Sequence, residues 1–236
     1  MKPPFATAYA NTPETIAASR RGLVGVVLCC LVPLLAGCGQ TPAATFRPNM
    51  VESAKQRLTS EQETQVATIL EAMFGTPDDP IALPETGLDI GKLRMAAGPV
   101  HSDIVGRKNG LFREHCSHCH GITGDGMGPT AAFLNTYPRD YRPGWFKFKS
   151  TERAEKPTHE DLVTILNNGI YGTSMPSFAL LGEAKVDALA EYVKYLSMRG
   201  EAELSLMRYY FELDAEDEGR LPEDREFLVE EILLPA

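Results

Sequence analysis

The chain has few cationic side chains for its length. Its 236 residues include 23 Lys and Arg against 32 Asp and Glu, which gives a formal net charge of −9 at pH 7. Nucleic acids and anionic membrane surfaces are both bound through clustered Lys and Arg, so this charge balance argues against either as the partner. Hydrophobic residues at 43% and charged residues at 23% are typical of a globular protein with one or two domains.

The chain also lacks an N-terminal apolar run long enough to span a bilayer comfortably. Residues 23–36 are apolar, but they fall short of the roughly 20 residues that a membrane helix needs and suit the apolar core of a signal peptide. The run ends in Leu-Ala-Gly-Cys at residues 35–38, which resembles the lipobox of bacterial lipoproteins. The resemblance implies that residues 1–37 are a signal peptide and that Cys38 carries lipid. The protein would then be exported and anchored on the periplasmic side of a bacterial membrane. An uncleaved N-terminal helix is the alternative.

Cysteine is scarce in the part of the chain expected to fold. The sequence has five cysteines, and Cys29 and Cys30 would leave with the signal peptide while Cys38 would be acylated. Only Cys116 and Cys119 then remain for the folded body, so the sequence predicts no structural disulfide.

The two remaining cysteines belong to residues 116–120, which read Cys-Ser-His-Cys-His. A C-x-x-C-H run is typical of covalent attachment of haem c, in which two thiols add to the porphyrin vinyl groups and the adjacent histidine binds the iron. The sequence therefore predicts one haem c attached at Cys116 and Cys119, with His120 as an axial ligand of the iron. A multi-haem peroxidase would need a second such motif, and the sequence holds one.

Two other kinds of site can contain a C-x-x-C pair. Zinc accepts mixed thiolate and imidazole ligands, so His115, His118 or His120 could complete a zinc site, although such sites usually draw a second ligand pair from a distant turn. A thioredoxin-like redox pair would require a βαβ context, whereas the surrounding pattern is helical.

The residues around the motif resemble those of a class I cytochrome c of the bacterial mono-haem type. The resemblance rests on Leu111-Phe112, on the motif itself, and on the glycine-rich residues 121–129, which include Gly124-Asp125-Gly126 and end in Gly128-Pro129. It covers residues 101–200 and implies a mainly α, cytochrome c-like helical fold wrapped around one covalent haem. It also implies that the Pro129 carbonyl accepts a hydrogen bond from the second ring nitrogen of His120, which would make the imidazole a better ligand.

Met175 is the candidate for the second axial ligand. It precedes Pro176 in a loop that begins at Gly172, and it lies far enough beyond His120 for the chain to wrap over the opposite face of the haem. A thioether stabilises ferrous iron and raises the reduction potential. Met127 is closer in sequence, but its loop is expected to leave along the haem edge.

Four further side chains are candidate partners of the haem propionates, because buried carboxylates require hydrogen bonds or opposite charges. They are Tyr171, Trp145, Arg139 and Arg142. The alternative is that the two aromatic residues pack in the core and that the two arginines are solvated.

The N-terminal part of the chain is expected to be an extension of this domain. Residues 38–100 are predicted to hold a mobile, proline-containing tether at residues 39–49, a helix at 60–74 that begins with a capping box from Ser60 to Glu63, and a short helix at 88–97.

The C-terminal part begins with the clearest amphipathic pattern, residues 183–198, after a helix expected at 158–168. Gly200 is expected to end this amphipathic helix. Residues 201–236 contain 12 acidic and 3 basic residues and are predicted to form an acidic extension with solvated helices at 204–213 and 224–233.

A haem iron with both axial positions filled leaves no coordination position for a substrate. The sequence therefore predicts an electron-transfer protein rather than an enzyme, which passes single electrons between respiratory partners such as a membrane redox complex or a soluble electron carrier. Two alternatives stay open. The chain could be a haem-based gas sensor or ligand-binding module in which a gas displaces Met175, or the haem subunit of a larger oxidoreductase complex.

Overall fold

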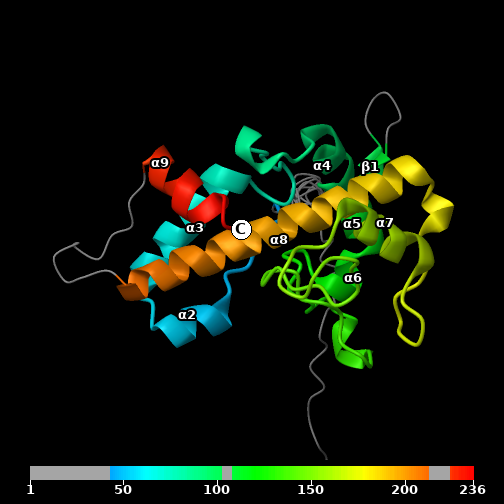
Figure 1. Cartoon of the computed structure of the whole chain (residues 1–236), viewed down its shortest axis with the longest axis horizontal. Helices are drawn as coiled ribbons and strands as arrows, with labels where there is room; N and C mark the ends of the chain where they lie inside the picture. Colours follow the sequence, from blue (N-terminus) through cyan, green and yellow to red (C-terminus); the bar gives the residue numbers. More distant parts are fainter. Residues whose placement is uncertain (1–42, 103–107, 213–223) are drawn as a thin grey trace, which may run out of the picture. The chain divides into compact units, whose positions relative to one another are not determined.

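Helix α8 (Glu183–Glu212) is the longest helix described and runs through the centre of the fold. The structure is a computed structural model that describes residues 43–102, 108–212 and 224–236. In Figure 1 the N-terminal half of α8 lies among the helices that follow residue 88, and its C-terminal half lies among α2, α3 and the last turns of the chain. The elements that contact α8 are α2 (Met50–Gln56), α3 (Ser60–Phe74), α4 (Ile90–Ala96), α5 (Leu111–His115), α7 (His159–Asn168), the 3-10 turn η3 (Ala179–Leu181) and the π-helical turn η4 (Leu228–Leu233).

The predicted mainly α class is confirmed. Two short strands, β1 (His101–Ser102) and β2 (Lys108–Asn109), pair antiparallel with His101 opposite Asn109. The other elements are helical: η1 (Pro84–Thr86), α6 (Ser117–His120), η2 (Ala131–Phe133) and α9 (Arg225–Phe227).

Helix α3 has the predicted extent but a different cap. Its capping box is formed by Thr59 and Gln62: the Thr59 hydroxyl accepts from the Gln62 amide at 3.3 Å, and the Gln62 side chain accepts from the Thr59 amide at 2.9 Å. The cap therefore lies one residue before the predicted Ser60. Val66, Leu70 and Phe74 lie on the buried face of the helix.

Two other predicted helices are present. Residues 88–97 contain α4, which Asp89 caps by accepting from the amides of Gly91 and Lys92. The helix expected at 158–168 is α7, and Thr158 caps it through the Asp161 amide at 3.1 Å.

Residues 43–49, here called the N-terminal strap, do not form the tether that the sequence predicts. The backbone amides of Ala44, Arg47 and Asn49 donate to the side chains of Asp78, Thr123 and Glu203, at 3.0, 3.0 and 2.9 Å respectively. These acceptors are distant in sequence, so no local sequence pattern predicts the three hydrogen bonds. The strap is held against the body because its amides are satisfied by other segments.

Gly200 does not end the amphipathic helix, contrary to the prediction. Helix α8 continues to Glu212, and Gly200 lies against the chain at Arg142. A Cβ at position 200 would come within 2.3 Å of the Arg142 Cα. Gly200 therefore allows two segments to approach closely and does not end the helix.

The described residues after Gly200, 201–212 and 224–236, are also not all solvated. Ala202, Leu206 and Met207 on α8 are fully buried. Val229, Ile232 and Leu233 of η4 are buried too, and η4 contacts α8. Residues 43–236 form one compact unit, so both predicted extensions share a core with residues 101–200.

The predicted signal peptide and Cys38 lie outside the described residues. In the described ranges, no helix is both long enough and apolar enough to span a membrane.

Candidate functional site

The C-x-x-C-H motif occupies the junction of α5 and α6, and a glycine-rich loop folds directly behind it. The amides of Gly126 and Gly128 donate to the carbonyls of His120 and Cys119 at 2.9 and 3.0 Å. A Cβ at Gly128 would lie 2.4 Å from the His118 carbonyl oxygen, so only glycine allows the loop to approach this closely. The loop fixes the last turn of α6, and with it the direction of His120.

A cavity of about 810 Å³ opens beside this junction. Cys116, Cys119 and His120 line one part of it, and Met175 lines another. Apolar side chains from three segments complete the wall: Phe146, Leu162, Leu166, Leu189 and Val193. The volume falls in the range of about 300–1,000 Å³ that is usual for small-molecule and cofactor sites.

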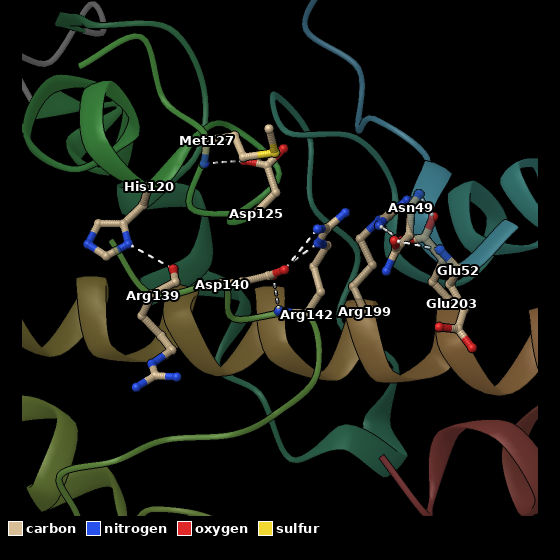
Figure 2. A network of polar contacts seen from close by, with 10 residues as sticks. All are labelled: Asn49, Glu52, His120, Asp125, Met127, Arg139, Asp140, Arg142, Arg199 and Glu203. Atoms are coloured by element: carbon tan, nitrogen blue, oxygen red, sulfur yellow. Dashed lines mark hydrogen bonds and ion pairs between the residues drawn. The ribbon is translucent and has the colours of Figure 1, made fainter. Parts of the chain in front are cut away.

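His120 is held by a backbone carbonyl. Its Nδ1 lies 3.1 Å from the carbonyl oxygen of Arg139, as Figure 2 shows. A carbonyl oxygen only accepts hydrogen bonds, so Nδ1 carries the proton and Nε2 keeps a lone pair. Burial lowers the pKa of His120 below its ordinary value of 6.5, and this outweighs the opposite effect of the Arg139 carbonyl. The imidazole is therefore neutral at pH 7 and suited to bind a metal through Nε2.

This hydrogen bond corrects one prediction. The resemblance to class I cytochromes c implied the Pro129 carbonyl as the acceptor, but in the structure the Arg139 carbonyl lies there, and Pro129 is exposed. Residues 121–130 turn back behind α6, while residues 138–142 pass beside His120. The acceptor is thus still a backbone carbonyl, but it belongs to a different segment of the chain.

Met175 reaches the cavity from a tight loop after α7. The Met175 carbonyl accepts from the Ile170 amide at 3.1 Å, and its own amide donates to the Thr173 hydroxyl at 3.2 Å. Gly169 has a φ of 67°, and a Cβ there would lie 2.7 Å from the Met175 carbonyl oxygen. Met127, the other methionine considered, is 71% exposed and is not among the described residues that line the cavity.

The two cysteines are free thiols. Cys116 is buried, and burial raises its pKa to about 12, so its thiol is protonated at pH 7. Cys119 lies 3.3 Å from the Thr130 hydroxyl. Across the described ranges, no group of three or more His, Cys, Asp or Glu side chains is arranged to hold a metal ion.

The four candidate propionate partners separate into two groups. Tyr171 and Arg139 line the cavity, with Tyr171 fully exposed at its edge. Arg142 is buried in an ion pair with Asp140 and Trp145 is 77% exposed, and neither is among the described lining residues.

Two aromatic residues of the site, Tyr141 and Phe146, were missed by sequence reasoning. The Tyr141 ring stacks on His120 with centroids 4.8 Å apart and planes at 17°, and the Phe146 ring stacks on Tyr141 with centroids 6.0 Å apart and planes at 12°. His115 also lines the cavity, with its ring 6.4 Å from that of Phe178. The signal that could have found them is the concentration of aromatic residues between positions 137 and 148.

The residues present fit a haem c. The cavity is large enough for such a cofactor, and its wall is mostly aliphatic and aromatic. The donor set comprises two free thiols in C-x-x-C spacing, a neutral imidazole with a free Nε2, and a thioether that lines the same cavity. Arg139 and Lys147 add cationic groups to the lining.

The comparison with family models supports a cytochrome c domain in the central part of the chain. Residues 106–193 match the model of the family described as cytochrome c oxidase, cbb3-type, subunit III. This match supports a haem-dependent electron-transfer role for the segment.

Comparisons over the whole chain add little. No curated protein matches it. The reducing HAO-like protein complex Kustc0457/Kustc0458 of Kuenenia stuttgartiensis contains a chain that is 25% identical, with a TM-score of 0.36. The match covers 41% of the present chain and 43% of that chain.

Proposed function

We propose that this protein transfers single electrons through one covalent haem c, bound by Cys116 and Cys119 and ligated by His120 and Met175. The observation that carries the proposal is the cavity of about 810 Å³ that the two thiols, the imidazole and the thioether line together. These groups come from two segments separated by α7, and the fold brings them to one space.

Each group has a defined task in the proposal. The Cys116 and Cys119 thiols form the covalent attachment, and the Nε2 of His120 is available as a ligand because Nδ1 donates to Arg139. Met175 offers a neutral, soft sulfur, which favours the reduced state of iron. The bound haem supplies a one-electron couple, and the aliphatic wall excludes water from it.

Filled axial positions leave no place for a substrate on the metal, which supports electron transfer over catalysis. The exposed Tyr171 and the cationic Arg139 at the cavity form part of the surface through which a redox partner would approach. The partner in this proposal is a membrane redox complex or a soluble electron carrier of a respiratory chain.

The proposal also places the protein outside the cytoplasm, on the periplasmic side of a bacterial membrane, with residues 1–37 removed and Cys38 acylated. The support is the lipobox-like Leu-Ala-Gly-Cys at residues 35–38. Labelling with a radioactive fatty acid tests it: the wild type should incorporate label and Cys38→Ala should not. Label retained in Cys38→Ala would contradict the anchor.

Absorbance spectroscopy tests the ligands. We expect the oxidised wild type to show the far-red charge-transfer band of a Met–iron bond, Met175→Ala to lose it, and Met127→Ala to keep it as the matched control. The reduced Met175→Ala protein should bind carbon monoxide, whereas the reduced wild type should not. Ready carbon monoxide binding by the wild type would favour a gas sensor instead.

Denaturing gels test the attachment. Haem should remain on the wild-type band and be absent from the Cys116→Ser, Cys119→Ser double variant. Haem that dissociates from the wild type would contradict covalent binding.

A further inference from the structure

The segment that contacts His120 is itself rigidly held, by residues that do not touch the imidazole. Asp140 and Arg142 form a bidentate ion pair: Arg142 Nε lies 3.0 Å from Asp140 Oδ1, and a terminal nitrogen lies 2.8 Å from Oδ2. The Arg142 amide also donates to Asp140 Oδ1 at 3.0 Å. Three nitrogen atoms of Arg142 thus donate to the Asp140 carboxylate, which fixes the conformation of the turn formed by residues 140–142.

This turn is wedged between α8 and the glycine-rich loop. On the α8 side, Gly200 lies so close that a Cβ would be 2.3 Å from the Arg142 Cα. On the loop side, a Cβ at Gly126 would be 2.7 Å from the Pro138 carbonyl oxygen, and the Tyr141 amide donates to the Gly124 carbonyl at 2.8 Å. The turn therefore has little freedom to move relative to α6.

The turn presents two groups to His120. One is the Arg139 carbonyl at 3.1 Å from Nδ1, and the other is the Tyr141 ring stacked at 4.8 Å. Figure 2 shows that the Arg139 guanidinium points away from His120, so Arg139 acts through its backbone. Both groups lie within the segment that the Asp140–Arg142 pair locks.

We infer that Asp140 and Arg142 are positioning residues that hold the Arg139 carbonyl and the Tyr141 ring against His120 and thereby set the reduction potential of the haem. The inference rests on the proposed function. A hydrogen bond from Nδ1 makes an imidazole a more basic ligand, and a more basic ligand favours ferric iron. Loosening the turn weakens this bond and raises the potential.

In Arg142→Gln, the loss of a positive charge and the loss of positioning change the reduction potential in opposite directions, which makes the inference testable. Arg142→Gln removes a positive charge, and by electrostatics alone this stabilises ferric iron and lowers the potential. Loss of the positioning of the Arg139 carbonyl instead raises the potential. Arg142→Lys keeps the charge but replaces the planar fork by a point charge that does not form the bidentate pair. Any shift in Arg142→Lys is therefore not due to net charge.

The experiment compares haem-loaded full-length variants in a redox buffer poised at the wild-type midpoint. In Arg142→Lys and Arg142→Gln we expect the ratio of reduced to oxidised protein to rise about threefold, which is about 30 mV for a one-electron couple. The Nδ1 proton of His120, followed by NMR in the reduced protein, should exchange faster in both variants. The matched control is Lys92→Gln, which breaks the 2.7 Å ion pair of Lys92 with Asp187 and also removes one positive charge. It should leave the ratio unchanged or lower it.

An unchanged ratio in Arg142→Lys overturns the inference, and so does a fall in Arg142→Gln that matches the control. If Arg142→Gln is recovered without haem, the ratio measured in Arg142→Lys is the test of the inference. Loss of haem from Arg142→Lys also counts against the inference. The proposed function fails separately, if the wild type itself lacks covalent haem or the Met–iron band.

Discussion

The ring of Tyr141 stacks on the imidazole of His120, with centroids 4.8 Å apart and planes inclined by 17°. Tyr141 is buried, and burial raises the pKa of its phenol well above 10. The ring therefore acts as a neutral, apolar support for the imidazole at any physiological pH. Phe146 stacks on Tyr141 with centroids 6.0 Å apart, so Tyr141 contacts both the imidazole and a second aromatic ring.

Truncation of the Tyr141 ring should destabilise the protein. We expect Tyr141→Ala to lower the free energy of unfolding by about 3–5 kcal/mol, because it removes a buried ring from a packed site. Tyr141→Phe keeps both stacks and should lose far less. Urea unfolding of the haem-loaded protein measures the difference. Equal losses in the two variants would show that the hydroxyl, and not the ring, is what matters.

The packing of Gly200 predicts an unusual response to alanine. In an open helix interior, glycine to alanine stabilises by about 1 kcal/mol. Gly200→Ala should instead lower stability by about 1–3 kcal/mol, because the added Cβ overlaps the Arg142 backbone. Thermal unfolding measures the change. Gly91→Ala in α4 is the control, since its Cβ would meet only the side chain of Asp89, at 3.1 Å. A stabilising Gly200→Ala would contradict the close approach.

Glu203 is buried and holds the N-terminal strap to α8. It accepts from the Asn49 amide at 2.9 Å and pairs with Arg199 at 3.1 Å. Glu203→Ala leaves Arg199 buried without its partner, so we expect a loss of about 3–5 kcal/mol. The Asn49 amide should also exchange its hydrogen faster.

The control for this prediction is Glu230→Ala, which removes the same group from an exposed position. Its stability should change by less than about 0.5 kcal/mol in the same urea titration. A loss from Glu203→Ala no larger than this would mean that the strap does not depend on the pair.

The ion pair of Lys92 and Asp187 predicts a pH dependence. The hydrogen bond from Lys92, and after it that from His159, lower the pKa of Asp187 below its ordinary 3.8. A carboxyl whose pKa is lower in the folded state stabilises the fold above pH 3.8, and this stabilisation is lost as pH falls through the folded pKa.

Urea midpoints measured from neutral pH down to about pH 2 should therefore fall less steeply in Lys92→Gln than in the wild type. Lys185→Gln is the control, because Lys185 lies on α8, the helix that carries Asp187, and forms no ion pair with the described residues. Parallel curves for the wild type and Lys92→Gln would contradict the role of this pair.

Much of the local structure could be predicted from the sequence. The extents of α3, α4 and α7 followed from side-chain periodicity and from capping residues, which act over three or four positions. The α3 cap was placed one residue late, because Ser60 and Thr59 are both competent caps and the pattern alone does not choose between them.

The candidate site could be predicted only in part. Its chemistry resides in residues 116–120, whose spacing is visible in any sequence. The acceptor of the His120 hydrogen bond is a backbone carbonyl, and every residue carries one, so nothing in the side chains distinguished Arg139 from Pro129. The burial of Tyr141 was equally hidden, since it depends on residues 21 and 55 positions away: His120, on which its ring stacks, and Leu196 of α8, which lies with Tyr141 against Gly124.

By itself, the sequence determined the attachment motif, the mainly α class and most helix limits, because covalent spacing, caps and periodicity are interactions between near neighbours. The tertiary structure decided which carbonyl meets His120, which methionine lines the cavity, and that α8 continues past Gly200 to bury the strap and the C-terminal turns. These features depend on contacts between segments up to 154 residues apart, as between Asn49 and Glu203, and such contacts exist only once the chain has packed.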